Sequence, residues 1–130
     1  MRVETDPAEL GGRIDGFFTA RIAALMQAGI ARERLILDPG MGFFLGSQPE
    51  ASLTVLRGVA RLRKKFGLPV LVSVSRKSFL RAITGRDMAH VGAATLAAEL
   101  YAAAQGVDFI RTHDAGALLD GLNIWSALGE

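Results

Sequence analysis

Three short apolar runs, each followed by polar residues and then by a helical pattern, constrain the fold of this chain more than any other feature. The runs cover residues 35–37, 70–72 and 109–110, so their first residues lie 35 and 39 positions apart. Connections of this length hold a helix and join parallel strands with a right-handed crossover. The continuous second run is typical of a strand buried on both faces. The sequence therefore predicts an α/β fold of parallel βα units and disfavours antiparallel hairpin architectures.

Local signals place a helix in each connection and at both ends of the chain. The pair Asp6-Pro7 starts the first helix, and Gly29 ends it. The capping box Ser47-Gln48-Pro49-Glu50 starts the second, which we expect to run as one helix to Gly67. Three further helices are predicted over residues 78–84, 92–105 and 117–128.

Composition excludes several classes of function. The chain has no Cys, which excludes a disulfide framework, a thiolate metal site and a cysteine nucleophile. The net charge of +2 does not predict nucleic acid as a partner. No apolar run approaches the roughly 20 residues of a membrane span, so no membrane is expected either. The first residues lack the apolar core of a signal peptide, and we expect a cytoplasmic protein.

The length of the chain is at odds with a complete barrel of βα units. A closed (β/α)8 barrel takes about 250 residues, and this chain has 130. Residues 1–130 are therefore interpreted as one domain or one piece of a domain.

The first apolar run ends in an Asp-Pro-Gly turn. Pro39 favours an extended conformation in the residue before it, which directs the Asp38 carboxylate outward from the strand end. An ionised carboxylate accepts two adjacent N–H donors of a planar, amidine-like heterocycle. Gly42 then brings Phe43 and Phe44 into a loop that either covers an aromatic ligand or packs against residues beneath it.

The segment Ser75-Arg76-Lys77-Ser78 follows the second run, where a strand turns into a helix. Free backbone amides, the positive end of the helix dipole, serine hydroxyls and two cationic side chains meet there. We expect this segment to bind an anion or a carbonyl group. It lacks the upstream glycines of a P-loop, and the last glycine of the loop at 40–46 is misplaced for a dinucleotide fingerprint, so both nucleotide motifs are rejected.

Arg111 and His113 follow the third run two positions apart, so both point to the same side of the strand end. Together they form a compact donor pair suited to phosphate oxygens, with a purely structural His113 as the alternative. The other histidine, His90, lies at a polar helix start and is interpreted as structural. No metal site is predicted from only two histidines and no cysteine.

Taken in order, the motifs at the three strand ends resemble those of dihydropteroate synthase, a (β/α)8-barrel enzyme of folate biosynthesis. They are Asp38-Pro39-Gly40-Met41-Gly42-Phe43, Ser75-Arg76-Lys77-Ser78 and Arg111-Thr112-His113-Asp114. The resemblance implies the carboxyl-terminal half of that TIM barrel, so that residues 1–130 form a partial pterin-binding domain. It also implies a transferase that joins para-aminobenzoate to dihydropterin-methyl diphosphate and releases diphosphate.

The resemblance assigns a role to each matched residue. Asp38 would hold the amino-pyrimidine edge of the pterin, and Lys77 would donate to its carbonyl and ring nitrogen. Arg111 would lie over the pterin face and reach the diphosphate together with His113, and Ser78 would receive the aminobenzoate carboxylate. The resemblance makes Lys77, Arg111 and His113 the catalytic residues. The remaining substrate-binding residues would be Gly42, Phe43, Phe44, Ser75 and Arg76.

Two departures from the family pattern modify these expectations. Where many members read Gly-Phe-Gly-Lys, this chain has Gly42-Phe43-Phe44-Leu45-Gly46, which resembles sulfonamide-insensitive forms, and Phe44 is expected to narrow the aminobenzoate pocket. The family's Asn-rich first loop, which helps to hold the diphosphate and Mg2+, is absent from this sequence. The Mg2+ ligand would therefore lie in the missing amino-terminal half, and this polypeptide alone is expected to have little or no activity. The full-length family is expected to form homodimers.

Two alternatives stay open at this point. Another pterin-binding barrel, such as a pterin-dependent methyltransferase, would share the architecture, but the carboxylate site at residues 75–78 favours the synthase. The second alternative is a half-barrel that binds ligands or assembles without catalysis. Its unpaired strand edges and apolar helix faces would favour aggregation, or a dimer that rebuilds a closed barrel.

Overall fold

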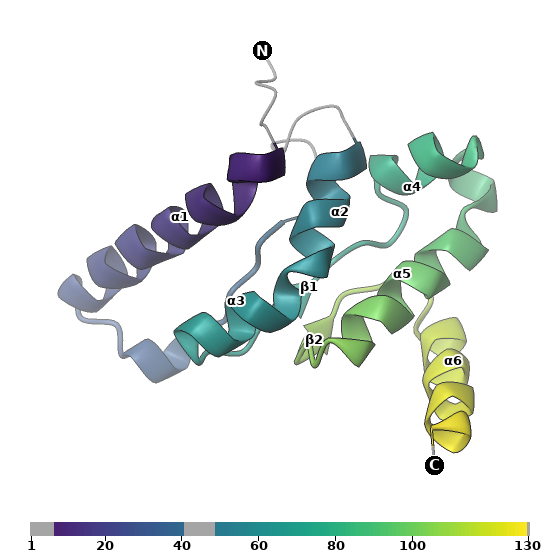
Figure 1. The fold of residues 1–130 in the computed structure, drawn as a ribbon. Coiled ribbons are helices and arrows are strands. Elements are labelled where there is room, and N and C mark those ends of the chain that lie inside the picture. The colour runs from purple at the N-terminus through teal and green to yellow at the C-terminus, as the bar shows by residue number, and fades with distance from the viewer. Residues whose placement is uncertain (1–6, 41–48, 130) are drawn as a thin grey trace.

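The computed structural model describes residues 7–40 and 49–129, in which helices alternate with short strands (Figure 1). The helix start signals at Asp6 and Ser47 lie outside the described residues. The helices are α1 (Pro7–Gln27), α2 (Pro49–Arg57), α3 (Val59–Phe66), α4 (Ser78–Thr84), α5 (Gly92–Ala104) and α6 (Ala115–Leu128). The strands are β1 (Leu71–Val72) and β2 (Phe109–Ile110), and 3-10 turns cover Arg32–Arg34 and Met88–His90.

The strand segments are parallel, as the length of their connections predicts. β1 and β2 pair with Leu71 opposite Phe109. The first predicted strand is reduced to one parallel bridge between Leu37 and Val70, supported by a 2.8 Å bond from Leu71 N to Leu37 O. Order and direction of the three segments are thus confirmed, whereas the first is shorter than expected.

Valines of the central strand segment form the middle of the core. Val70, Val72 and Val74 are fully buried, whereas Leu71 and Ser73 between them are only partly buried. The expectation of a strand buried on both faces is therefore wrong, because the helices cover one face and leave the other partly open. Residues packed with the valines in the core include Leu10, Phe18, Leu62, Phe66 and Ala102.

The helix expected to run as one piece to Gly67 is divided into α2 and α3 at Gly58. Gln105, at the end of α5, inserts its side-chain amide at the break. Its Oε1 accepts from Ala60 N at 2.8 Å, and its Nε2 donates to Leu56 O at 2.8 Å. In an unbroken α-helix the Ala60 N–H would bond the Leu56 carbonyl directly. The single-helix prediction is wrong because a side chain from a distant part of the chain enters this backbone ladder.

The last two helices, α5 and α6, pack against each other. α6 begins after Asp114, whose Oδ1 accepts from Ala117 N at 3.0 Å as an N-cap. Gly121 lets α6 approach α5, because an added Cβ would lie 3.0 Å from Leu96 Cδ1. The predicted helices 92–105 and 117–128 are thereby confirmed. Across residues 7–40 and 49–129, none of the helices has the length and apolar character needed to cross a membrane.

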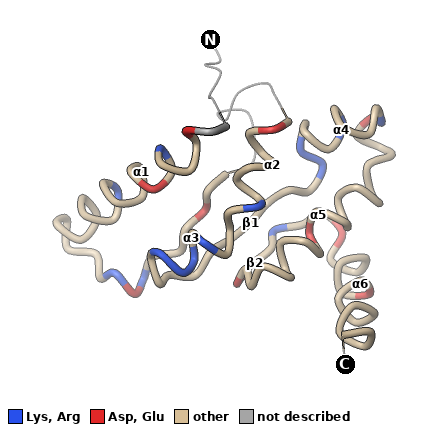
Figure 2. Tube along the Cα trace, viewed as in Figure 1, with Lys and Arg blue, Asp and Glu red and all other residues tan. Residues whose placement is uncertain are grey.

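Basic residues gather on α3, where Figure 2 shows a run of Lys and Arg. Arg61 donates to both carboxylate oxygens of Asp15 in α1, at 3.0 and 2.9 Å. Arg63 binds both oxygens of Asp108, which also accepts from Val70 N at 2.9 Å. Arg63 and this backbone donor lower the pKa of the Asp108 carboxyl. Two cations of α3 therefore tie α3 to α1 and to the beginning of the sheet.

Candidate functional site

Polar residues of the three strand ends lie at the carboxyl edge of the parallel sheet. Because Leu37 bridges to Val70 and β1 pairs with β2, Asp38 and the segments 75–78 and 111–114 all follow neighbouring strand ends. In parallel α/β folds, ligands bind at this edge. The structure therefore brings the described candidate residues to one side of the sheet.

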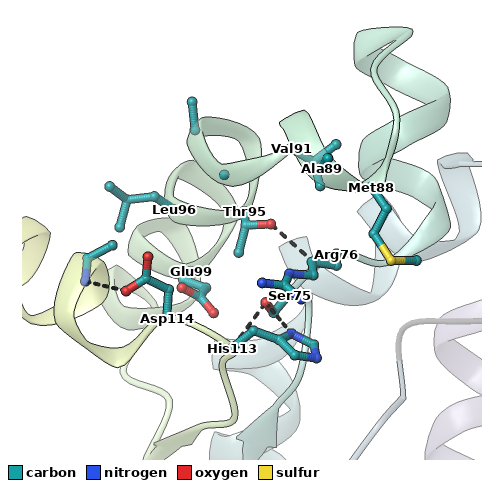
Figure 3. A pocket seen from close by; sticks show the side chains of 13 residues that line it. Ser75, Arg76, Met88, Ala89, Val91, Thr95, Leu96, Glu99, His113 and Asp114 are labelled. Carbon is teal, nitrogen blue, oxygen red and sulfur yellow. Dashed lines mark hydrogen bonds between the residues drawn. The ribbon is translucent and has the colours of Figure 1, made fainter.

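Ser75 and His113 contact each other across the ends of the two strands (Figure 3). Ser75 Oγ lies 2.7 Å from His113 Nδ1, and the backbone N–H of His113 donates to the same oxygen at 3.3 Å. Ser75 is 4% exposed, whereas His113 is exposed. A buried hydroxyl therefore holds an exposed imidazole.

Arg76 has a left-handed backbone conformation, with a φ of 58° that is uncommon outside glycine. Its N–H donates at 3.2 Å to Oγ1 of Thr95, a buried residue of α5. Strained conformations of this kind persist where surrounding contacts hold them, and they cluster at functional sites. Thr95 thus fixes the turn that leads from the strand toward Lys77.

Lys77 and Ser78 lie where the strand segment passes into α4. The Lys77 N–H donates to Val74 O at 3.1 Å, and the extended conformation of Lys77 makes Ser78 the first helical residue. Lys77 is half-buried and Ser78 is exposed. This is the strand-to-helix position that the sequence predicts for the anion-binding segment, on a helix of seven residues.

Asp38 is exposed, and its Oδ1 accepts from the backbone N–H of Gly40 at 3.0 Å. Gly40 has a φ of 75°, which glycine adopts without strain. The turn therefore orients the Asp38 carboxylate. Arg111 is also exposed, and its backbone N–H donates to Val72 O at 3.0 Å. The remaining candidates, Gly42, Phe43 and Phe44, lie outside the described residues.

A cavity of about 690 Å³ lies between the strand ends and helices α5 and α6 (Figure 3). Its polar lining consists of Ser75, Arg76, Thr95, Glu99, His113 and Asp114. Three of the predicted site residues, Ser75, Arg76 and His113, therefore line the same cavity. Four others lie at the same edge without lining this cavity, namely Asp38, Lys77, Ser78 and Arg111.

Glu99 is a residue of the cavity wall that sequence reasoning missed. It is 1% exposed, and its Oε2 has no hydrogen-bond partner among the described residues. Burial raises the pKa of Glu99, a hydrogen bond with Thr112 partly lowers it, and the carboxylate of Asp114 raises it further. The available signal was the four-residue spacing from Thr95, which places two polar residues on one face of an Ala-rich helix.

Cations and N–H donors make the described part of the site suited to anions. Residues 7–40 and 49–129 contain no group of three or more His, Asp or Glu placed to hold a metal. Arg76, Lys77, Arg111 and His113 instead supply cations and N–H donors to the strand edge. Chemically, the edge can bind an anionic group with these residues and a planar N–H donor with Asp38.

Comparisons with known proteins agree over nearly the whole chain. The family described as "Pterin binding enzyme" matches residues 1–113. Dihydropteroate synthase type-2 of Escherichia coli is 62% identical over 129 residues, which is 99% of this chain and 48% of that protein. Dihydropteroate synthase type-3 of Escherichia coli is 54% identical over 128 residues, covering 98% of this chain and 49% of that protein.

Solved structures give the same result at the level of the fold. Dihydropteroate synthase from Xanthomonas albilineans in complex with 7,8-dihydropteroate has a TM-score of 0.85 and 35% identity, covering 93% of this chain and 45% of that chain. This likeness confirms the predicted fold class of parallel βα units that form half of a (β/α)8 barrel. The chain spans about half the length of the curated relatives it matches.

Proposed function

Because this chain belongs to the pterin-binding enzyme family, we propose that it forms the carboxyl-terminal half of a dihydropteroate synthase barrel. The proposed reaction joins para-aminobenzoate to dihydropterin-methyl diphosphate and releases diphosphate. The observation that carries the proposal is the gathering of Asp38 and the segments 75–78 and 111–114 at one edge of a parallel sheet. The relative solved with 7,8-dihydropteroate supports this substrate class.

Asp38, Lys77 and Arg111 bind the pterin in this proposal. The Asp38 carboxylate keeps acceptor capacity beside its bond to Gly40, so it accepts from the amino-pyrimidine edge of the ring. Lys77 donates to the pterin carbonyl and ring nitrogen. The planar guanidinium of Arg111 lies over the ring face, where stacking and charge both favour it.

Arg111 and His113 bind the leaving group. The bond between the pterin methylene carbon and the diphosphate oxygen breaks, and its electron pair stays on the diphosphate. The amine nitrogen of para-aminobenzoate then forms the new C–N bond and loses a proton. Donors fixed beside the departing oxygen stabilise the charge that develops there, and positioning of the two substrates supplies the remaining acceleration.

Ser78 receives the aminobenzoate carboxylate, because it is an exposed hydroxyl residue at the start of α4. Following the family resemblance, we assign Phe43 to the aminobenzoate pocket and assign Phe44 the role of excluding a bulkier sulfonamide. In a complete synthase that carries this loop, Phe44→Gly should increase sulfonamide inhibition and preserve turnover of para-aminobenzoate. An unchanged inhibition constant for the sulfonamide would contradict the role of Phe44.

The complete enzyme needs groups beyond those described in this chain. Following the family resemblance, we place the Mg2+ ligand in the amino-terminal half, and no step above depends on the ion. We also place the complete enzyme in the cytoplasm as a homodimer. Exposed apolar residues of α6, such as Ile124 and Leu128, support the association of copies.

A turnover assay tests the proposed function. The purified chain, supplied with both substrates and Mg2+, should form little or no dihydropteroate. A fusion that adds the amino-terminal half of the type-2 relative should form product, measured as diphosphate release and by mass spectrometry. Turnover by the chain alone at the rate of an ordinary synthase would overturn the expectation that this chain by itself is inactive, and an inactive but folded fusion would overturn the synthase assignment.

A matched pair of arginine variants tests the site within that fusion. Arg111→Ala should lower turnover on the order of a hundredfold, because one preorganised donor to a developing anion contributes about that much. Arg34→Ala removes an exposed charge of the same kind from the 3-10 turn that precedes the first strand segment, and it should leave turnover unchanged. Equal rates for the two variants would remove Arg111 from the proposed mechanism.

A further inference from the structure

The hydroxyl of Ser75 is committed to a single partner. Ser75 is 4% exposed, and both hydrogen bonds of its Oγ within the described chain go to His113. One comes from the His113 backbone N–H at 3.3 Å, and the other joins Oγ to Nδ1 at 2.7 Å (Figure 3). The orientation of the imidazole and its tautomer are therefore coupled to this buried serine.

Counting donors and acceptors assigns the proton between Oγ and Nδ1. A serine hydroxyl has one donor proton and two acceptor lone pairs. The His113 backbone N–H takes one lone pair, so the hydroxyl proton still needs an acceptor, and an unprotonated Nδ1 at 2.7 Å provides it. If Nδ1 carried the proton, the hydroxyl proton of Ser75 would have no acceptor among the described residues, which is costly for a buried donor.

This assignment also fixes the second ring nitrogen. A neutral imidazole whose Nδ1 accepts a hydrogen bond carries its proton on Nε2. Nε2–H is then a donor on an exposed ring, at the strand edge that also carries Arg111. The opposite tautomer would present a lone pair to an anion and repel it.

We propose that Ser75 is a positioning residue that fixes His113 as the Nε2–H tautomer, so that His113 donates a hydrogen bond to the diphosphate of the substrate. The identity of the anion rests on the proposed function, whereas the tautomer rests on the contacts between the two residues. In this arrangement Ser75 acts through His113 and takes the place of the direct substrate-binding role expected from the sequence.

Nitrogen-15 NMR of the histidine rings tests the tautomer in the chain itself. The chain has two histidines, and His90, whose Nδ1 lies 2.6 Å from Asp87 Oδ1, is an internal reference. At about pH 8, where an ordinary imidazole is neutral, His113 should carry its proton on Nε2 and have an unprotonated Nδ1. A proton on Nδ1, or an equal mixture of the two forms, would overturn the proposal.

Variants of Ser75 test whether the hydroxyl causes the preference. Ser75→Ala should convert His113 into a mixture of tautomers and leave the His90 signals unchanged, whereas Ser75→Thr keeps a hydroxyl and should keep the preference. Ser73→Ala, two positions back and without a hydrogen bond to His113, is the matched control. A folded Ser75→Ala chain with an unchanged His113 tautomer would overturn the proposal. If Ser75→Ala does not fold, the spectrum of the wild type still shows whether His113 carries its proton on Nε2.

Titration with inorganic diphosphate separates this inference from the proposed function. Diphosphate should shift the His113 Nε2–H signal, and Ser75→Ala should weaken binding roughly fivefold to tenfold, as expected for the loss of one oriented hydrogen bond. A His113 that has the expected tautomer but does not respond to diphosphate would contradict the anion assigned under the proposed function. The effect of Ser75 on the tautomer would stand in that case.

Discussion

At the scale of single residues, Glu99 couples the stability of the chain to pH. Because burial raises its pKa, the folded state holds the Glu99 proton more tightly than the unfolded state does. Stability is therefore lost as the pH rises from the ordinary carboxyl range through this raised pKa. Glu99→Gln cannot ionise, so we expect the variant to gain in free energy of unfolding relative to the wild type as the pH rises above the ordinary carboxyl range. Urea unfolding at several pH values measures the difference.

The control for this prediction is Glu33→Gln, which removes the same charge from an exposed 3-10 turn. The difference in free energy of unfolding between Glu33→Gln and the wild type should not grow with pH in the way expected for Glu99→Gln. Parallel pH profiles for the wild type and Glu99→Gln would show that burial of Glu99 does not affect its ionisation.

At the same scale, the positions of two site residues could be predicted from the sequence, whereas the hydrogen bond between them could not. The Ser75 and His113 positions follow from strand ends, because a parallel sheet places consecutive strand ends at one edge. Their direct hydrogen bond does not follow, since it depends on the register between β1 and β2 and on the burial of Ser75. Glu99 was missed because one acidic residue in an Ala-rich helix is ordinarily solvent-exposed.

At the scale of elements, the break between α2 and α3 is where a tertiary contact overrides a local pattern. The capping signal and helical periodicity of residues 47–67 predict one helix, and both halves are indeed helical. The interruption comes from Gln105, 45 positions away from Ala60, and no window of neighbouring residues contains that information. The helices without such an insertion, α1, α4, α5 and α6, follow their predicted ranges closely.

Gln105→Leu should remove the cause of the break. Two hydrogen bonds of 2.8 Å are lost, while Ala60 N and Leu56 O become free to bond each other directly. We expect a net loss of about 1 kcal/mol in the free energy of unfolding, because the restored backbone bond offsets part of the loss. Urea unfolding gives the energy, and amide exchange at Ala60 reports whether its N–H is still protected.

Gly58→Ala distinguishes insertion of Gln105 from backbone flexibility as the origin of the break. An added Cβ would meet Thr54 O at 3.5 Å and Val55 O at 3.7 Å, both ordinary contacts. The φ of −93° at Gly58 is also accessible to alanine. The break should therefore persist in Gly58→Ala, with a stability gain of up to about 1 kcal/mol from the lower entropy of the unfolded chain. A continuous helix in this variant would assign the break to glycine.

At the scale of the whole molecule, half a barrel leaves one helix with an uncovered apolar face. Leu118, Leu122 and Trp125 lie on the same side of α6, four and three positions apart. Leu118 is buried and Leu122 is partly buried, whereas Trp125 is 56% exposed. Figure 1 shows the end of α6 projecting beyond α5. This side of α6 is therefore buried near the start of the helix and solvent-exposed near the end of the helix.

We expect this apolar face of α6 to be buried against another chain, because exposed apolar patches favour association. Trp125 is the one tryptophan of the sequence, so its emission should shift to shorter wavelength as protein concentration rises, in step with an increase in sedimentation coefficient. Trp125→Glu should reduce the sedimentation coefficient to that of a monomer. Asn123→Glu adds the same charge on the opposite side of α6 and should leave association unchanged. A wild-type chain that sediments as a monomer at every concentration would mean that this apolar face stays solvated.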